Sequence, residues 1–318
     1  MAIAVGIDEA GYGPVLGPLV VAATVIETTG GAADANLWQL LDRGVTQNVR
    51  HPQARICIAD SKVLHQGRAG IAPLERNVLA TCPLALPAGL EAFTRWLGIP
   101  DDHLADGEPW HESPGPALPL EADLQTVRAM QSAFRRTVDD AGVRVRSIRA
   151  GLVQPWRFNR LVEATNNKAA VLWAVAVELL EQALAECPDG PVQVTMDKHG
   201  GRTYYGGLLQ EALPLVPIET IRETPAESRY RFSPRGWQVD LTIREKADGS
   251  SLPVALASMY AKYLREVFMA RFNRWWQARA SHVAPTAGYW TDYQRWSAEM
   301  VSLLAGLELP AQHYIRSR

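Results

Sequence analysis

The sequence has few cysteines and no strong excess of charge of either sign. Its three cysteines, Cys57, Cys82 and Cys187, are widely spaced and form no Cys-x-x-Cys pair. This number and spacing favour a reduced, cytoplasmic protein over one built on disulfides. The formal net charge is −2 over 318 residues, so the molecule is not a polycation. Nucleic-acid binding would therefore require a local basic face.

Signals for export or for membrane insertion are also missing. The N-terminus carries acids rather than a basic region, which argues against a signal peptide. The apolar run over residues 15–26 is too short to span a bilayer, so we expect no membrane association. With 47% hydrophobic and 21% charged residues, the composition is that of a soluble globular protein. Its length suits one large domain or a domain with an appendage.

Hydrophobic patterns predict a mixed α/β fold. Strands are expected over residues 3–8, 19–27, 143–152, 192–196 and 215–221, the first two forming a hairpin. Helices are expected over residues 124–140, 157–186, 253–276 and 291–304, with a short helix capped by Asp60 or Ser61 after an apolar run at 54–59. A segment near 98–121, rich in proline, glycine and acids, indicates a surface loop or insertion. Residues 224–237 are polar, with basic and aromatic side chains mixed.

The most informative stretch is a pair of carboxylates, Asp8 and Glu9, at the end of an apolar strand. Acids buried at a strand end are costly unless they are paired, hydrogen-bonded or bound to a metal. A turn containing Gly11, Gly13 and Gly17 follows, and glycines let a backbone or ligand approach closely. The turn lacks the Gly-Lys-Ser/Thr ending of a P-loop and the spacing of a dinucleotide-binding loop. Because neighbouring strand residues point to opposite faces, the turn must bend the backbone if both acids face one site.

Two further acids lie at comparable places. Asp197 ends a later strand, and Asp248 precedes a long helix. Four carboxylates around one point would repel each other unless cations neutralise them. Hard oxygen ligands, without a His/Cys set at zinc spacing, favour Mg²⁺ or Mn²⁺, and two such ions can promote hydrolysis of a phosphodiester. Taken singly, each acid is more often a helix cap or a solvated loop end, so the cluster is a hypothesis.

The chain also carries a series of short motifs in a particular order. They are Asp8-Glu9-Ala10-Gly11-x-Gly13 with Gly17-Pro18, Asp60-Ser61-Lys62, Asp197 after an apolar strand, Lys246-Ala247-Asp248 followed by Ala257-Ser258-Met259-Tyr260-Ala261-Lys262, Gly288-Tyr289-Trp290-Thr291 and His313-Tyr314-Ile315-Arg316-Ser317. In this order they resemble the signature motifs of the type 2 ribonucleases H (ribonucleases HII and HIII). The motifs span nearly the whole chain.

This resemblance implies an architecture and an activity. The fold would be RNase H-like, with a mixed central sheet flanked by helices, a helical C-terminal part and insertions. Residues 1–262, including the Pro-rich insertion near 98–121, would form the catalytic domain, and residues 263–318 a helical substrate-binding part. The activity would be metal-dependent endonucleolytic hydrolysis of the RNA strand of RNA–DNA hybrids, or cutting at ribonucleotides embedded in duplex DNA. It would use two Mg²⁺ or Mn²⁺ ions and leave 5′-phosphates, with a monomer as the expected state.

The resemblance also implies roles for particular residues. The catalytic metal ligands would be Asp8, Glu9, Asp197 and Asp248. The substrate-binding residues would be Gly11, Tyr12, Gly13, Lys62, Lys246 and Tyr289. Among these, Gly11 and Gly13 would offer backbone contacts to the ribose 2′-hydroxyl. Tyr289 would stack on the neighbouring sugar, and Lys62 would approach the phosphates of the cleaved strand.

The chain departs from the family pattern in several places, which suggests a divergent branch. Tyr12 stands between the two glycines where the family has arginine or lysine. The family's Asp-Gly after the third acid is Asp197-Lys198-His199 here. Lys198 and His199 would contact substrate or shuttle protons, or else be a solvated lysine and an incidental turn residue. Residues 98–121 and 224–240 are longer than expected. The alternatives are therefore a nuclease for another nucleic-acid structure and a non-catalytic nucleic-acid-binding descendant.

Basic and aromatic residues are interleaved in the last third of the chain. The basic ones are Arg229, Arg231, Arg235, Lys246, Lys262, Arg265, Arg271, Arg274 and Arg279, and the aromatic ones are Tyr230, Phe232, Trp237, Trp275 and Trp276. Such a mixture can follow a nucleic-acid backbone while bases stack on the rings. The alternative is an amphipathic helix with its arginines in water. For Trp275 and Trp276 we expect core packing.

Overall fold

A hairpin of two apolar strands starts the central sheet of the computed structural model. Strand β1 (Ala2–Ala10) pairs antiparallel with β2 (Leu19–Thr28). Every residue of β2 is buried, because the strand lies inside the sheet and is covered on both faces. The expected hairpin is therefore confirmed, with both strands slightly longer than the sequence predicted.

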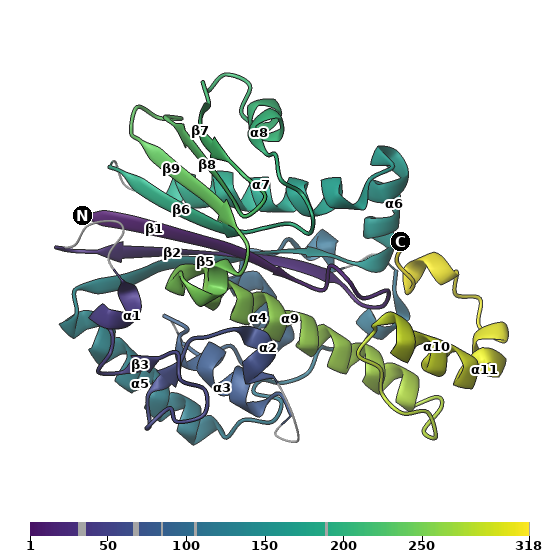
Figure 1. Ribbon diagram of the computed structural model, residues 1–318. Helices are drawn as coiled ribbons and strands as arrows, with labels where there is room; N and C mark the ends of the chain where they lie inside the picture. The colour runs from purple at the N-terminus through teal and green to yellow at the C-terminus, as the bar shows by residue number, and fades with distance from the viewer. Residues whose placement is uncertain (31–35, 66–69, 84, 105–106, 188–189, 318) are drawn as a thin grey trace.

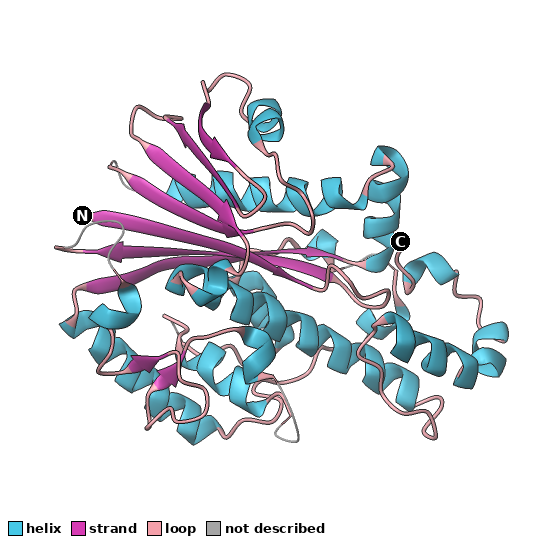
Figure 2. Ribbon diagram, viewed as in Figure 1, coloured by secondary structure: helices cyan, strands magenta, loops and turns pink. Residues whose placement is uncertain are grey.

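The structure describes residues 1–30, 36–65, 70–83, 85–104, 107–187 and 190–317. Over these residues the main sheet has seven strands in the order β5-β2-β1-β6-β9-β8-β7 (Figure 2). β5 (Val143–Val153) pairs antiparallel with β2, whereas β6 (Val192–Asp197) and β9 (Val239–Arg244) run parallel to β1. β8 (Glu227–Phe232) and β7 (Glu219–Glu223) complete the sheet with antiparallel pairings.

Helices cover both faces of this sheet, as Figure 1 shows. α9 (Leu252–Gln277) packs against β1 and β2 on one face, and α7 (Lys168–Glu186) packs on the other. Side chains of β1 alternate between the two layers: Ile7 belongs to the apolar cluster with α7, and Ala4 packs against the cluster with α9. The α/β class with a mixed central sheet flanked by helices is the one that the sequence predicted.

The remaining elements form three groups along the chain. Between β2 and β5 lie α1 (Leu37–Leu40), β3 (Val45–Thr46), β4 (Ile56–Cys57), α2 (Ser61–Leu64), α3 (Ala72–Ala80), α4 (Leu90–Trp96), η2 (Asp101–His103), η3 (Pro109–His111) and α5 (Leu124–Asp140). α6 (Pro155–Thr165) precedes α7, α8 (Gly206–Ala212) follows β6, and η4 (Ala247–Gly249) precedes α9. α10 (Trp290–Glu299), α11 (Val301–Ala305) and η5 (Ala311–His313) lie beyond the far end of α9 (Figure 1).

The helix expected over residues 157–186 is instead two helices, α6 and α7. Asn166 adopts the left-handed conformation with φ 49°, and Asn167 caps α7 by accepting a hydrogen bond from the Ala169 N–H. Asparagine tolerates the left-handed region better than most residues and is a good N-cap. The apolar periodicity continues across this break, so the prediction of a single helix was wrong.

The strands at the far edge of the sheet were also predicted incompletely. β7 begins four residues later than the expected strand at 215, and the polar stretch 224–237 contains β8. In β8 buried and exposed residues alternate, so its charged positions made the segment look like a loop. The helix expected over 291–304 is divided into α10 and α11 by Met300.

The Pro-rich segment near 98–121 is partly core, which corrects the expectation of a surface loop. Trp110 is 4% exposed, and its ring centroid lies 4.9 Å from that of Phe272. Glu108 and Leu118 are buried as well, while residues 105 and 106 lie outside the described residues. The segment therefore anchors the second half of α9, where the apolar cluster around Trp276 and Trp296 forms.

The expected boundary between residues 262 and 263 falls inside α9, which runs from Leu252 to Gln277 without a break. The two proposed parts are thus joined by a continuous helix. Among the helices of the described ranges, none combines the length and the apolar character needed to cross a membrane.

Close contact between β1 and α9 gives the first prediction. A Cβ at Gly6 would lie 2.1 Å from the Pro253 carbonyl carbon and 2.2 Å from the Val254 nitrogen. Gly6→Ala should therefore lower the free energy of unfolding by about 3 kcal/mol or more, because backbone must move to make room. Urea unfolding measures this change. As a control, Gly207→Ala in α8 has open space around it and should be neutral or stabilising; equal stability of both variants would contradict the predicted contact.

Candidate active site

One pocket of about 480 Å³ gathers residues from widely separated parts of the chain. It is lined by all ten residues that the resemblance assigns to metal or substrate binding, namely Asp8, Glu9, Gly11, Tyr12, Gly13, Lys62, Asp197, Lys246, Asp248 and Tyr289. Asp60, Ser258, Lys262 and Arg265 line it too. Their location in one pocket is thus a property of the fold, while their roles stay predictions.

A larger groove of about 870 Å³ lies between α5 and β5. Its lining includes four arginines, Arg135, Arg144, Arg146 and Arg149, and one acid, Asp139. None of the ten predicted site residues lies there. We therefore place the candidate active site in the smaller pocket, where the carboxylates gather.

Parallel pairing of β1 with β6 explains why two of the acids are neighbours. The pairing ends at Ile7 and Met196, so Asp8 and Asp197 are the next residues on adjacent strands. Carboxyl ends of parallel strands meet at one edge of a sheet, where ligand sites form in α/β proteins. Asp248 reaches the same edge from η4, just before α9 begins.

Asp8 and Glu9 share the pocket without the bend that we expected after them. β1 stays regular through Ala10, with Glu9 still paired to Val21 of β2. The pairing with β6, however, has already ended. One edge of β1 is therefore open at this level, and side chains from both faces of the strand can reach the space beyond it.

Burial and mutual repulsion shift the ionisation of the first two acids. Burial raises the pKa of Asp8 well above its ordinary range, and the charges of Glu9 and Asp197 raise it further. Burial, together with Asp197, raises the pKa of Glu9 to about 7, although the Lys62 ammonium opposes this shift. Hydrogen bonds from Ser258 and from the Glu9 N–H partly stabilise the Asp8 carboxylate.

The other acids are held by hydrogen bonds as well as by charge. Asp197 accepts a hydrogen bond of 2.8 Å from the Ala247 N–H, which ties the end of β6 to η4. Burial raises the pKa of Asp197, and burial followed by the charge of Asp60 raises the pKa of Asp248. Asp60 caps α2 and was not among the predicted acids; its place in the Asp60-Ser61-Lys62 motif was the signal that pointed to it.

The donor set in this pocket fits a hard divalent cation. It consists of carboxylate oxygens, and the Glu9 Oε2 atom is buried without a hydrogen-bond partner. Among the described residues, however, no three carboxylate, imidazole or thiolate side chains are close enough together to share one ion. Charged carboxylates repel each other at short range, so we expect them to move together only when a cation neutralises them. Oxygen ligands of this kind suit Mg²⁺ or Mn²⁺.

Cations in the pocket differ in their availability. Lys262 and Arg265 both pair with Glu266, at 2.6 and 3.0 Å. Lys62 and Lys246 take part in none of the ion pairs found in the described part of the chain. Lys246 has φ 54°, a conformation that is unfavourable for a non-glycine residue and that clusters at functional sites. Lys62 and Lys246 are therefore the pocket cations that, within the described ranges, are not held by a carboxylate.

The glycine turn after β1 is fastened by distant segments. Gly11 has φ +87°, and a Cβ there would lie 2.5 Å from the Pro18 carbonyl oxygen, so only glycine fits. The buried Arg316 guanidinium donates hydrogen bonds to the carbonyls of Gly11 and Pro14. Burial and, to a lesser extent, the nearby Arg265 charge together lower the pKa of Arg316 to about 9. The C-terminal segment thus fixes the turn that borders the acids.

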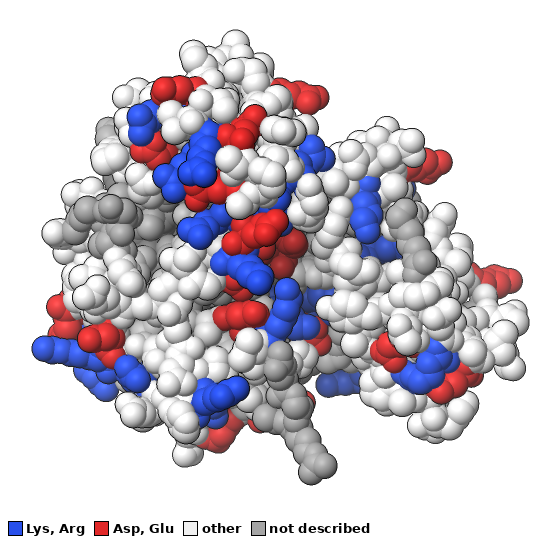
Figure 3. Space-filling model, viewed as in Figure 1, with Lys and Arg blue, Asp and Glu red and all other residues white. Residues whose placement is uncertain are grey.

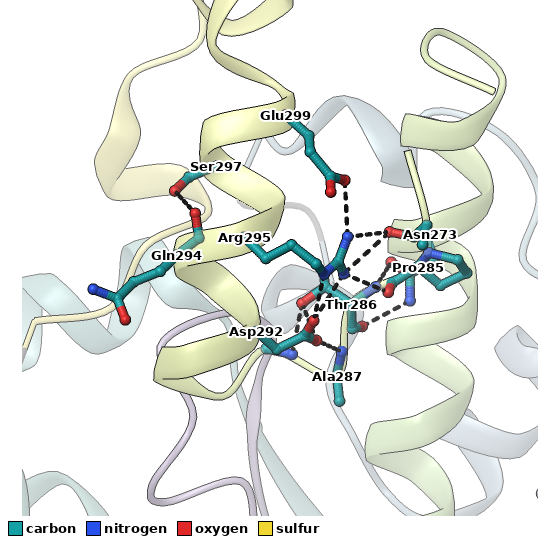
Figure 4. A network of polar contacts seen from close by, with 11 residues as sticks. Asn273, Pro285, Thr286, Ala287, Asp292, Gln294, Arg295, Ser297 and Glu299 are labelled. Carbon is teal, nitrogen blue, oxygen red and sulfur yellow. Dashed lines mark hydrogen bonds and ion pairs between the residues drawn. The ribbon is translucent and has the colours of Figure 1, made fainter. Parts of the chain in front are cut away.

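A polar network joins the start of α10 to the loop that precedes it (Figure 4). Asp292 accepts hydrogen bonds from the Thr286 hydroxyl and the Ala287 N–H, at 2.7 and 2.6 Å. Arg295 donates to Asp292 and to the Pro285 carbonyl. This network holds the loop before Tyr289, a residue that is 50% exposed and lines the pocket, with the Arg265 guanidinium 5.9 Å from the centroid of its ring.

Most of the interleaved basic and aromatic residues have structural roles. Trp276 is 2% exposed and lies in the cluster beyond the sheet, as expected. Arg265 is buried, and its guanidinium donates to the Ala287 carbonyl. Arg271 donates to the carbonyls of Trp110, His111 and Ser113. These two arginines therefore hold loops in place and are not free to follow a nucleic-acid backbone.

Lys198 and His199 do not line the pocket. Lys198 forms an ion pair of 3.0 Å with Glu245. His199 is buried against the rings of Trp173 and Tyr205, and burial lowers its pKa to about 4. Neither residue is therefore the solvated lysine or the incidental turn residue of the alternative: the side chain of Lys198 is 7% exposed and that of His199 is buried, so both have packing roles outside the pocket.

Comparison with known proteins finds similar solved structures but no matching family model and no matching curated protein. The chain is similar to RNase HII of Archaeoglobus fulgidus, solved in complex with PCNA, at 15% identity and a TM-score of 0.45, covering 99% of this chain and 94% of the other. Ribonuclease H2 of Pyrococcus horikoshii is 17% identical, with a TM-score of 0.46, and the match covers 98% of this chain and 92% of the other. RNase H3 of Aquifex aeolicus is 14% identical, with a TM-score of 0.41, and the match covers 98% of this chain and 70% of the other.

The raised pKa of Glu9 gives a prediction on stability. A carboxyl whose pKa is about 7 in the folded state and 4.5 when unfolded stabilises the fold below pH 4.5, and this stabilisation is lost as the pH rises through 7. In a metal-free buffer Glu9→Gln should therefore be the more stable protein at pH 8, by on the order of 3 kcal/mol. The advantage should shrink towards zero at pH 4.5.

Urea unfolding across this pH range measures the difference. The exposed Glu211 of α8 offers a control, since Glu211→Gln should show no such pH-dependent gain. A difference between the wild type and Glu9→Gln that stays constant from pH 4.5 to pH 8 would contradict the proposed repulsion.

Proposed function

We propose that this protein is a divalent-metal-dependent endonuclease that cuts the RNA strand of RNA–DNA hybrids or cuts duplex DNA at embedded ribonucleotides. One observation supports the proposal most directly. Asp8, Glu9, Asp197 and Asp248 line a single pocket at the carboxyl ends of parallel strands, next to a rigid glycine turn. A protein that only binds nucleic acid gains nothing from several mutually repelling acids.

In this proposal the four acids hold two Mg²⁺ or Mn²⁺ ions. When bound, such ions supply Lewis acidity that promotes attack of water on a phosphodiester and stabilises the leaving oxygen. The protein contributes the positions of the carboxylates: Asp197 is fixed by the Ala247 N–H, and Asp8 by the hydroxyl of Ser258 and the N–H of Glu9. The Lys62 ammonium favours the charged forms of Glu9, Asp197 and Asp248.

Selection for RNA requires recognition of the 2′-hydroxyl group. Gly11 and Gly13 border the pocket without side chains, and no heavy atom lies within 4 Å of a Cβ placed on Gly13. A sugar can therefore reach the peptide group of Gly13, whereas the Gly11 α-carbon is packed against Pro18 and Arg265. The half-exposed ring of Tyr289 lies on the same pocket, and Lys62 and Lys246 are placed to contact phosphates.

The charge pattern of the surface restricts how a duplex would be held. Acidic and basic side chains lie next to one another along the middle of the face seen in Figure 3. A uniformly basic face, which would bind any polyanion strongly, is not visible on this side. Affinity would therefore depend on a few placed cations and on contacts in the pocket.

The test of this function is cleavage of three labelled duplexes: all-DNA, RNA–DNA hybrid, and DNA with one ribonucleotide, each in Mg²⁺ and in Mn²⁺. The wild type should cut only the duplexes that contain ribonucleotides. Asp197→Asn should lower cleavage at least 100-fold, because a neutral amide lacks the negative charge with which the carboxylate would hold a divalent cation. Gel analysis of the products measures both effects.

A matched control is Asp240→Asn on the neighbouring strand β9, because Asp240 pairs with Arg231 and does not line the pocket. This variant should cut like the wild type. Wild-type turnover by Asp197→Asn would contradict the metal assignment. Cleavage of the all-DNA duplex would indicate a nuclease for another structure, and binding without cleavage would indicate a descendant that no longer catalyses.

A further inference from the structure

Tyr12 carries a cation on its ring at the rim of the pocket. The residue stands between Gly11 and Gly13 in the turn after β1 and lines the pocket. The Lys168 ammonium lies 4.7 Å from the centroid of the Tyr12 ring. This distance is within the range of a cation–π interaction. A side chain of α7 is thereby brought to a turn that lies between two strands of the sheet.

The position of Lys168 is unfavourable for the helix that carries it. Lys168 is the first residue of α7, directly after the Asn167 cap. The N-terminus of a helix is the positive end of its dipole, so a cation there opposes the dipole. Lys168 also takes part in none of the ion pairs between described residues. Residues that break a local rule without a structural gain point to functional sites.

The loop that carries Arg202 lies against the same ring, since a Cβ placed on Gly200 would be 3.8 Å from the Tyr12 Cε1 atom. Burial and the charge of Glu9 raise the pKa of the Tyr12 hydroxyl, and the charge of Arg202 opposes them. Arg202 is half-buried in the loop after β6, and within the described ranges it pairs with no carboxylate. Both cations near Tyr12 therefore keep their charges available.

The positive charges that line the pocket come from one part of its wall. Its lysines and its arginine come from α2, from the residue before η4 and from α9. The lining residues contributed by β1 and the glycine turn include no lysine or arginine. Lys168, on the ring of Tyr12, and Arg202, in the loop that lies against this ring, are thus cations that a polyanion would meet on this side.

We propose that Lys168, held on the ring of Tyr12, and Arg202 form a subsite for a backbone phosphate of the bound duplex. The proposal rests on the proposed function only in that the ligand is a nucleic acid. An ammonium on an aromatic face keeps its N–H groups free to donate to a phosphate oxygen. The ring places this charge beside the glycine turn, so the phosphate would be one next to the nucleotide in the pocket.

Binding of labelled duplexes in EDTA at several salt concentrations tests the subsite without depending on cleavage. Loss of one phosphate contact lowers the slope of log affinity against log salt by about 0.9. Lys168→Gln should show this smaller slope. The factor by which this substitution weakens binding should be about 3.5 times larger at 50 mM than at 200 mM salt. This ratio is the fourfold difference in salt concentration raised to the power of about 0.9. The effect should be the same for all-DNA and ribonucleotide-containing duplexes.

Three further variants make the result specific. Lys168→Arg should keep the wild-type slope, and Tyr12→Leu, which removes the ring, should behave like Lys168→Gln. Arg160→Gln removes a similar pair on α6, where the guanidinium lies 4.8 Å from the Trp156 ring centroid, and should change nothing. Thermal unfolding verifies that each variant is folded.

An unchanged slope in folded Lys168→Gln would overturn the subsite. A loss of affinity confined to ribonucleotide-containing duplexes would also overturn it, because a phosphate contact does not discriminate between sugars. Failure of the wild type to cut any duplex would count against the proposed function alone, since the binding slopes are measured without metal.

Discussion

The parallel pairing of β1 with β6 is the constraint on which the site depends. It ends at Ile7 and Met196, and this places Asp8 beside Asp197 at an edge where no further strand intervenes. The hydrogen bond from Ala247 to Asp197 then brings η4 and Asp248 to the same edge. Burying these acids together is unfavourable, as their raised pKa values indicate. The well-packed sheet and α9 offset that repulsion and keep the acids in place.

Much of the fold could be predicted from local patterns, but not its long-range closure. The strands β1 and β2 and the helices α5 and α9 have clear hydrophobic periods, and their bounds were nearly correct. The break between α6 and α7 was missed because it depends on the conformation of Asn166, which apolar spacing does not encode. β8 was missed because its alternating charges resemble a loop. In each case a single residue or a tertiary contact overrode the pattern.

The candidate site was predicted as a set of positions, and the structure adds how they meet. The motifs contain all ten predicted site residues, and the fold brings these residues to one pocket. Spacing gave no indication of Lys168, and the terminal motif contained Arg316 without indicating what it contacts. Both residues act across large distances in the chain: Lys168 through the ring of Tyr12, and Arg316 through the carbonyls of Gly11 and Pro14. Only a three-dimensional arrangement brings such partners together.

The contact between Arg316 and the glycine turn has a consequence for synthesis of the protein. Gly11 and Arg316 are 305 positions apart, so the turn leaves the ribosome long before its fastening exists. At about 5–20 residues per second, the N-terminal hairpin waits on the order of 15–60 s for the residue that completes it. During this interval the nascent chain has its first two acids but no finished turn beside them. The turn beside the pocket is therefore fastened only after residue 316 has been synthesised and has docked.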